Sequence, residues 1–284
     1  MKRSFFFFNL IIFFFLATSC SHLFYQPDAF LYTDKEKIQK YFKENEIQGS
    51  EGKIIVWTFS NPNLKPEQKK PVHLILFHGN AQNVSSHFYS LFWILEKGYD
   101  YTIFDYPGYG GSEGEPTRQS TTQSGIDVYK WVKSQHPDQK FFIFGQSLGG
   151  NISIYSASKV LPDPQLCGVA VESTFLNYHT VARRLLAKNW FTWIFQPIAY
   201  VLVSDSYSAS EAVRQLGTTP LMVMHGDRDP VVGYENGQDL FEAANQPKSF
   251  IDVTGGQHID ALTFQDRNKY QKIFTDFIDQ SCLK

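Results

Sequence analysis

The chain has 284 residues, which is long enough for one large α/β domain with a substantial core. Its hydrophobic fraction of 43% is typical of globular proteins and excludes a largely disordered chain. The formal net charge is −2 and becomes −4 without residues 1–19, because removing Lys2 and Arg3 leaves 24 basic against 28 acidic residues. This balance does not indicate a nucleic-acid partner, which usually requires a basic patch.

The amino terminus has the layout of a secretory signal peptide, which we assign to residues 1–19. A basic start precedes an apolar stretch from Phe5 to Leu16 that is too short to span a bilayer comfortably. The following "LATSC" resembles a bacterial lipobox, in which Cys20 becomes the lipidated first residue of the mature protein. With Ser21 next, the usual sorting rule favours the outer membrane over the inner one. We therefore expect a protein of the cell envelope held on the membrane surface by lipid; the alternative is an ordinary cleaved signal with a chance cysteine.

The chain contains two further cysteines, Cys167 and Cys282. In an exported protein they can pair in a disulfide, but Cys167 lies in the apolar run "LCGVAV", where a buried free thiol fits equally well. Both alternatives stay open at this point.

Strand-like and helix-like segments alternate from residue 53 onward, and residues 20–52 form a separate N-terminal segment. The predicted strands are 53–59, 71–78, 101–105, 140–145, 167–173, 220–226 and 249–253. The predicted helices are 83–97, 118–134, 148–160, 233–245 and 262–281. This alternation predicts an α/β domain over 53–284, with a mostly parallel central sheet and helices on both faces.

Residues 175–207 interrupt the alternation. They contain "NWFTWIFQPIAYVLV" and are too long for a simple crossover, so we expect a small helical cap inserted in the domain.

Ser147 lies at a corner between a strand and a helix. It is the centre of "GQSLG", a G-x-S-x-G nucleophile elbow in the strand–turn–helix context that this motif requires. Because Leu148 begins the helix, its backbone N–H is a candidate donor to an oxyanion.

A serine nucleophile requires a base, and His258 follows the last predicted strand, where the chain order Ser…Asp/Glu…His places it. The other histidines lack this setting. We expect His22, His87, His136 and His179 to face solvent, and His73 and His225 to be structural.

The acid that orients the base is expected to be Asp229 in "HGDRDPVV", after the strand at 220–226. Glu172, one strand earlier in "VEST", is the main rival, and Asp227 is a weaker one. The turn "FHGNA" offers the N–H of Asn80, or of Ala81, as the second oxyanion donor.

Together these segments resemble the α/β-hydrolase superfamily, and within it the Bem46-like group with its ABHD17-type depalmitoylases and bacterial lipoprotein-like hydrolases. The motifs are "FHGNA", "DYPGYGGSEGEPT", "GQSLGG", "VESTF", "HGDRDPVV" and "GGQH", and the match spans about residues 53–278. The resemblance implies Ser147 as nucleophile, His258 as base, Asp229 as acid, and Asn80 and Leu148 at the oxyanion positions.

We therefore expect a serine hydrolase of acyl esters or thioesters that works through an acyl-enzyme and needs no metal or organic cofactor. The aromatic cap and the lipid anchor favour a small-molecule or lipid substrate with an apolar acyl chain. One alternative is a serine peptidase acting on short peptides, and another is a lipid-tethered binding protein with a silent site. The sequence does not predict the oligomeric state.

Overall fold

The structure, a computed structural model, describes residues 24–188, 190–264 and 266–283. The predicted signal peptide and Cys20 lie outside the described residues. Within that part of the chain, no helix has the length and apolar character needed to cross a membrane.

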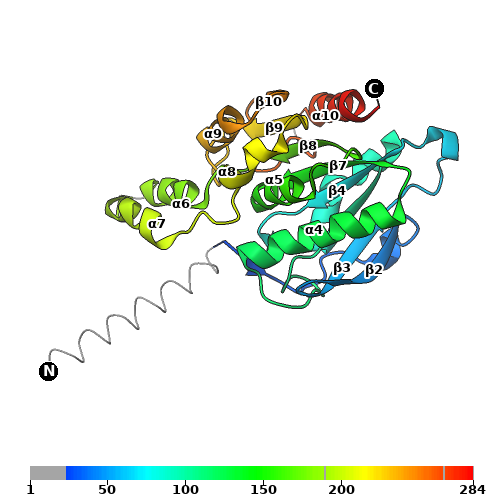
Figure 1. The fold of residues 1–284 in the computed structure, drawn as a ribbon, viewed down its shortest axis with the longest axis horizontal. Helices are drawn as coiled ribbons and strands as arrows, with labels where there is room; N and C mark the ends of the chain where they lie inside the picture. The colour runs from blue at the N-terminus through cyan, green and yellow to red at the C-terminus, as the bar shows by residue number, and fades with distance from the viewer. Residues whose placement is uncertain (1–23, 189, 265, 284) are drawn as a thin grey trace.

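An eight-stranded sheet forms the centre of the described chain (Figure 1). Its strands are β2 (Phe42–Gly49), β3 (Gly52–Phe59), β4 (Val72–Phe77), β6 (Asp100–Phe104), β7 (Lys140–Gln146), β8 (Leu166–Glu172), β9 (Leu221–Gly226) and β10 (Lys248–Val253). The spatial order is β10-β9-β8-β7-β4-β6-β3-β2. Strands β10 to β6 pair in parallel, while β3 pairs antiparallel with both β6 and β2. The sheet is therefore mostly parallel, as the alternating pattern predicts.

Side chains of the central strands supply two hydrophobic cores, one on each face of the sheet. In β4, Ile75 and Phe77 belong to one core, whereas Leu74 and Leu76 belong to the other. This alternation follows from the period of two residues in a strand, and both faces are apolar because both are covered.

Helices cover the two faces. The core shared by α4 (Arg118–Gln135), α5 (Leu148–Val160) and α9 (Glu235–Ala243) includes Val128, Ile152 and Leu240. The opposite core is closed by α10 (Arg267–Cys282), through Tyr270, Phe274 and Ile278, and by the segment 84–97. These helices confirm the predicted layers.

The segment 84–97 differs from the single helix that we expected. It consists of α3 (Val84–His87) and two short 3₁₀ helices, η3 (Phe88–Ser90) and η4 (Phe92–Lys97), and it ends at Gly98 with φ +86°. Serine, β-branched and aromatic residues, which are poor helix formers, dominate its first half. Phe88 also stacks on Phe59, so ring packing on the sheet competes with regular helix geometry.

The strand β2 was not predicted, and it adds part of the segment 20–52 to the sheet. Its sequence "FKENEIQG" is mostly polar, and Ile47 is its one buried residue. An edge strand is stabilised by its hydrogen bonds to the neighbouring strand rather than by burial of an apolar run. It therefore lacks the apolar pattern that identifies the other strands. At the other end of the chain, α10 begins at Arg267 rather than at residue 262, because residues 261–264 form a turn that buries Leu262.

The predicted cap contains two helices, α6 (Tyr178–Ala187) and α7 (Gln196–Leu202), with a 3₁₀ turn η5 (Trp193–Phe195) before α7. Figure 1 shows α6 and α7 projecting from one end of the sheet. The chain returns to β9 through α8 (Ala209–Ala212) and η6 (Val213–Leu216), which pack on α5.

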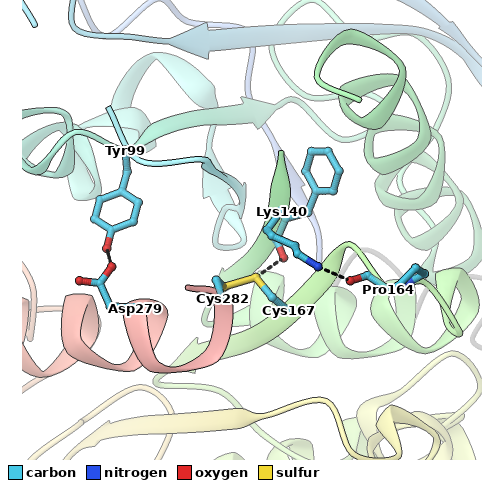
Figure 2. Close-up of a disulfide and its surroundings, with 7 residues drawn as sticks. Tyr99, Lys140, Pro164, Cys167, Asp279 and Cys282 are labelled. Atoms are coloured by element: carbon cyan, nitrogen blue, oxygen red, sulfur yellow. Dashed lines mark hydrogen bonds between the residues drawn. A yellow bond between two sulfur atoms is a disulfide. The ribbon is translucent and has the colours of Figure 1, made fainter. Parts of the chain in front are cut away.

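A disulfide joins Cys167 near the start of β8 to Cys282 at the end of α10, 115 residues later (Figure 2). Their Cα atoms lie 5.0 Å apart. The open question about these two cysteines is thus resolved in favour of pairing. The bond lies at the amino end of the parallel strands, and nearby the Tyr99 hydroxyl donates to Asp279 of α10 (Figure 2).

Candidate active site

The candidate site lies at the carboxyl edge of the parallel sheet. The turns after β4, β7, β9 and β10 carry Asn80, Ser147, Asp229 and His258 respectively, and Glu172 is the last residue of β8. Because the carboxyl ends of parallel strands meet at one edge, residues far apart in sequence come together there.

Ser147 lies between the last residue of β7 and the first residue of α5. Its backbone has φ +53° and ψ −121°, a strained conformation for a residue with a side chain. Two hydrogen bonds hold it: its N–H donates to the carbonyl of Glu172 (2.9 Å), and the Thr174 hydroxyl donates to the carbonyl of Ser147 (2.6 Å). The turn is thus fixed by the neighbouring strand β8.

The elbow requires glycine at position 149. A Cβ there would lie 2.2 Å from the carbonyl oxygen of Phe77 at the end of β4. The start of α5 therefore approaches the β4 backbone more closely than any side chain allows. On the same side, a Cβ at Gly79 would lie 3.6 Å from the Cβ of Ser147, which places the turn after β4 directly beside the serine.

His258 bridges Ser147 and Asp229. Its Nε2 lies 3.0 Å from the Ser147 Oγ, and its Nδ1 lies 2.8 Å from the Asp229 Oδ2. The Nδ1 proton points at a carboxylate, so Nε2 is left to accept a proton from the serine hydroxyl. The structure thus brings the three side chains predicted for catalysis into one hydrogen-bonded row.

Asp229 is held as a carboxylate at the far end of that row. Its Oδ1 accepts the backbone N–H groups of Val231 (2.8 Å) and Val232 (2.9 Å). Burial raises the pKa of this carboxyl, but the side chains of His225 and His258 and the backbone donors outweigh burial and hold the pKa well below its usual range. His225 also donates from Nε2 to the Val232 carbonyl (2.8 Å), so it stabilises the turn that carries Asp229, as its predicted structural role requires.

The two rival acids make other contacts. Glu172 is buried; its Oε2 accepts from Gln146 Nε2 (2.7 Å), and its Oε1 accepts from the backbone N–H of Ala261 (2.9 Å). Asp227 accepts the N–H of Gly255 (2.7 Å). Asp229 is therefore the carboxylate that the structure places on His258.

Glu172 has a role that the sequence analysis missed. It links Gln146, the neighbour of Ser147, to Ala261 in the loop after His258, while Ser173 Oγ accepts the N–H of Ile259 (3.2 Å) in the same loop. Burial raises the pKa of Glu172. The end of β8, with Glu172 and the following Ser173, thus connects the serine turn to the histidine loop, and no local sequence pattern indicates that long-range contact.

The turn after β4 is braced by its side chains. Asn80 Oδ1 accepts hydrogen bonds from the backbone N–H of Gln26 (2.8 Å) and from the Tyr109 hydroxyl (3.1 Å). The side-chain oxygen of Asn80 is therefore bonded to other residues and not to the backbone N–H of Asn80 itself. Ala81 belongs to the short strand β5 (Ala81–Gln82), which pairs with β1 (Gln26–Pro27). Within the described part of the chain, neither the Asn80 nor the Leu148 N–H has a protein acceptor.

Several histidines are less exposed than we expected. His22 lies outside the described residues, but His87, His136 and His179 are half-buried rather than solvent-facing. His87 donates to the Ala81 carbonyl (2.8 Å) and stacks on His78, so it supports the turn after β4. Its position seven residues beyond the turn in a short helix explains why the sequence did not reveal this contact. His136 stacks on His73, whose ring is fully buried as its strand position predicts.

The row Ser147–His258–Asp229 can activate a hydroxyl for attack on an acyl carbonyl, and the N–H groups beside it can hold the resulting oxyanion. Among the described residues, no group of three or more histidine, cysteine, aspartate or glutamate side chains is arranged to hold a metal ion.

Comparisons with known proteins agree with this architecture. Residues 72–196 match the family model described as alpha/beta hydrolase fold. The esterase Pf2001 of Pyrococcus furiosus superposes with a TM-score of 0.70 at 18% identity, covering 91% of this chain and 98% of that one. The serine hydrolase XC6422 of Xanthomonas campestris, described as lacking a lid, gives a TM-score of 0.59 at 18% identity over 84% of this chain and 95% of that one. The chain thus has the predicted α/β-hydrolase fold.

Two curated relatives extend the comparison. The uncharacterized protein YfhR of Escherichia coli K12 is 28% identical over 261 residues, which cover 90% of this chain and 86% of YfhR. The lysophosphatidylserine lipase ABHD12 of Macaca fascicularis is 28% identical over 193 residues, which cover 63% of this chain and 47% of ABHD12. The chain therefore spans about half the length of that lipase.

Proposed function

We propose that this chain, which has the α/β-hydrolase fold, is a serine hydrolase that cleaves acyl esters or thioesters. The observation that carries the proposal is the position of His258, with Nε2 at 3.0 Å from Ser147 Oγ and Nδ1 at 2.8 Å from Asp229 Oδ2. The esterase and lipase among the proteins similar to this chain support ester hydrolysis in general.

The first half-reaction forms an acyl-enzyme. Ser147 Oγ attacks the acyl carbonyl carbon while His258 Nε2 takes the hydroxyl proton, and Asp229 stabilises the imidazolium that forms. The carbonyl oxygen becomes an oxyanion and accepts hydrogen bonds from the N–H groups of Asn80 and Leu148. When the tetrahedral intermediate collapses, His258 returns the proton to the departing alcohol or thiol.

The second half-reaction releases the acid. Water enters in place of the leaving group and gives a proton to His258 as its oxygen attacks the acyl carbon. The new intermediate breaks its bond to Ser147 Oγ, which recovers the proton from His258. The strained backbone of Ser147 serves both steps because it holds Oγ clear of the strand and helix.

A substrate panel tests this reaction. Matched p-nitrophenyl esters of two to sixteen carbons, acyl thioesters of the same acids and a panel of short peptide amides would be offered to the full chain, with fluorophosphonate labelling in parallel. We expect labelling and turnover of esters or thioesters. Cleavage of peptides alone would assign a peptidase, and a chain that neither labels nor turns over any substrate would be a binding protein.

We further propose that the chain belongs to the Bem46-like group and acts as a lipid-anchored protein of the bacterial envelope, with Cys20 as the attachment site. The disulfide supports export, since such bonds persist in oxidising compartments. Acylated protein should partition into detergent and incorporate labelled palmitate, whereas a Cys20→Ser variant should do neither. A wild-type protein whose mature form starts at another residue would contradict the anchor and leave the hydrolase proposal untouched.

A further inference from the structure

The cap carries a cluster of exposed apolar side chains that the reaction does not use. Six residues, which we call the cap patch, are 57–76% exposed: Trp190, Phe191, Trp193, Ile194, Tyr200 and Val201. They lie within twelve consecutive positions, and Trp190 stacks on Phe191 with ring centroids 3.6 Å apart. Soluble proteins seldom leave apolar side chains so concentrated in contact with water.

Core packing does not explain the cap patch. The side of the cap that packs on the core is formed by three buried residues, Val181 and Ala182 of α6 and Ala199 of α7. The residues of the patch are instead largely exposed, and α6 and α7 stand out from the body of the molecule (Figure 1). The patch is therefore a surface and requires a partner of its own.

The charged residues near the cap patch indicate what kind of partner binds there. The sequence contains no aspartate or glutamate from 173 to 204, but it contains Arg183, Arg184 and Lys188. Arg184 pairs with Asp239 (2.8 Å), whereas Arg183 and Lys188 form no ion pair with the described residues. Arg183 and Lys188 instead donate to neutral acceptors, Gln196 Oε1 (3.5 Å) and the Pro230 carbonyl, and so keep their positive charge unbalanced by a described carboxylate. Exposed tryptophan and tyrosine next to such cations match the boundary of an anionic bilayer, where aromatic rings sit at headgroup level and cations meet lipid phosphates.

Two contacts place this surface relative to the rest of the chain. Phe24, the first described residue, packs edge-on against Tyr178 at the start of α6, with ring centroids 5.1 Å apart. The amino-terminal end of the described chain therefore lies beside the cap. On the other side, Lys188 Nζ donates to the carbonyl of Pro230, the residue after Asp229. The cap thus contacts both the amino-terminal end of the described chain and the turn that carries the acid.

We propose that the cap patch is a docking surface for the interface of a lipid bilayer that contains anionic lipid. The rings and aliphatic side chains insert at the level of the headgroups, and Arg183 and Lys188 contact the lipid phosphates. Docking through the cap brings the Asp229 turn to the membrane surface, where acyl substrates are concentrated. This binding does not depend on the chemistry proposed for Ser147, so a Ser147→Ala variant should dock unchanged.

Tryptophan quenching provides a direct test. The mature chain, residues 20–284 with Cys20→Ser in every sample, is mixed with vesicles of equimolar phosphatidylglycerol and phosphatidylcholine whose acyl chains are brominated. The other three tryptophans, Trp57, Trp93 and Trp131, are buried or half-buried, so quenching reports on Trp190 and Trp193. We expect quenching in these vesicles, and we expect it to be lost in Trp190→Phe/Trp193→Phe, which should still sediment with them.

A matched pair of variants tests the surface itself. Trp190→Ser/Ile194→Ser/Val201→Ser should weaken vesicle binding at least about tenfold, because three inserted side chains are lost. The control Phe30→Ser/Tyr89→Ser/Phe264→Ser removes three equally exposed rings outside the cap and should bind like the parent chain. Binding should also fall with pure phosphatidylcholine.

Three results would overturn the proposal. One is equal vesicle binding by the cap variant and its control. Another is quenching that persists without Trp190 and Trp193. The third is a dimer in solution that dissociates in the cap variant, combined with no vesicle binding by the parent chain, since a second copy would then cover the patch.

Discussion

The carboxyl edge of the sheet and the cap differ in which side chains they bury and which they expose. At the edge, polar side chains are buried and held by hydrogen bonds: Glu172, Asp229 and His225 are each enclosed, and each contacts a neighbouring turn. In the cap, apolar side chains are exposed and lack such support from the core. Buried polar groups tolerate few geometries, whereas exposed apolar groups tolerate many partners. We infer that the edge is built for one reaction and the cap for adhesion.

Removal of the nucleophile should reduce turnover more than any other substitution and should affect only the carboxyl edge of the sheet. Ser147→Ala should lower turnover of a p-nitrophenyl ester by about 10⁴-fold or more, because it removes the hydroxyl that His258 contacts. Fluorophosphonate labelling should disappear while the unfolding transition stays in place. Labelling that survives in the variant would show that another residue is the nucleophile.

Loss of the orienting carboxylate should come next. Asp229→Asn should reduce kcat by about 10⁴-fold, because an amide at this position favours the wrong tautomer of His258. Steady-state kinetics on the same ester measure this change. If Glu172→Gln proved the more damaging of the two substitutions, the orienting acid would be Glu172 at the end of β8.

The disulfide allows stability to be separated from chemistry, because it lies at the opposite edge of the sheet. Cys167→Ala/Cys282→Ala should lower the free energy of unfolding by about 2–5 kcal/mol, since the bond closes a long loop in the unfolded chain. Urea unfolding gives this value, and kcat/KM in the absence of urea should match the parent chain. A large loss of activity would mean that the two edges are coupled.

Replacement of Glu172 should change turnover moderately and should also change how the free energy of unfolding depends on pH. In Glu172→Gln one donor, from Gln146 or Ala261, loses its acceptor, and we expect kcat to fall by no more than about tenfold.

The pH dependence of stability gives a second readout of Glu172. Because burial raises the folded pKa of this carboxyl, its contribution to stability is fully present below the unfolded pKa of about 4.3 and is lost as the pH rises through the folded pKa. The free energy of unfolding of the variant should therefore fall less than that of the parent chain as the pH rises above about 4.3. If the free energy of unfolding changed with pH in the same way for the variant and the parent chain, this would contradict a raised pKa of Glu172.

The smallest effect should come from the cap. With a water-soluble short-chain ester, Trp190→Ser/Ile194→Ser/Val201→Ser should keep kcat/KM within about twofold of the parent value, because these side chains are exposed and have no part in the steps proposed for Ser147 and His258. A clear drop with this substrate would place the cap in the reaction itself and weaken the contrast drawn above.

The parts of the protein that have a local signal can be predicted from the amino-acid sequence. Apolar runs predict seven strands of the sheet, and the turn residues around Ser147, Asp229 and His258 indicate the candidate site. These signals are local because a buried strand must be apolar and a sharp turn at its end must contain small residues.

The contacts between segments that are distant in the sequence depend on the folded arrangement of the chain. That arrangement paired Cys167 with Cys282, placed Asp229 rather than Glu172 on His258, and made Glu172 the link between the serine and histidine turns. It also added the polar edge strand β2, which is stabilised by its pairing with β3. Each of these outcomes depends on which chain segments become neighbours in the folded sheet. Hydrogen bonds and disulfides act over a few ångströms, so residues 29 to 115 positions apart reveal such a contact only after folding.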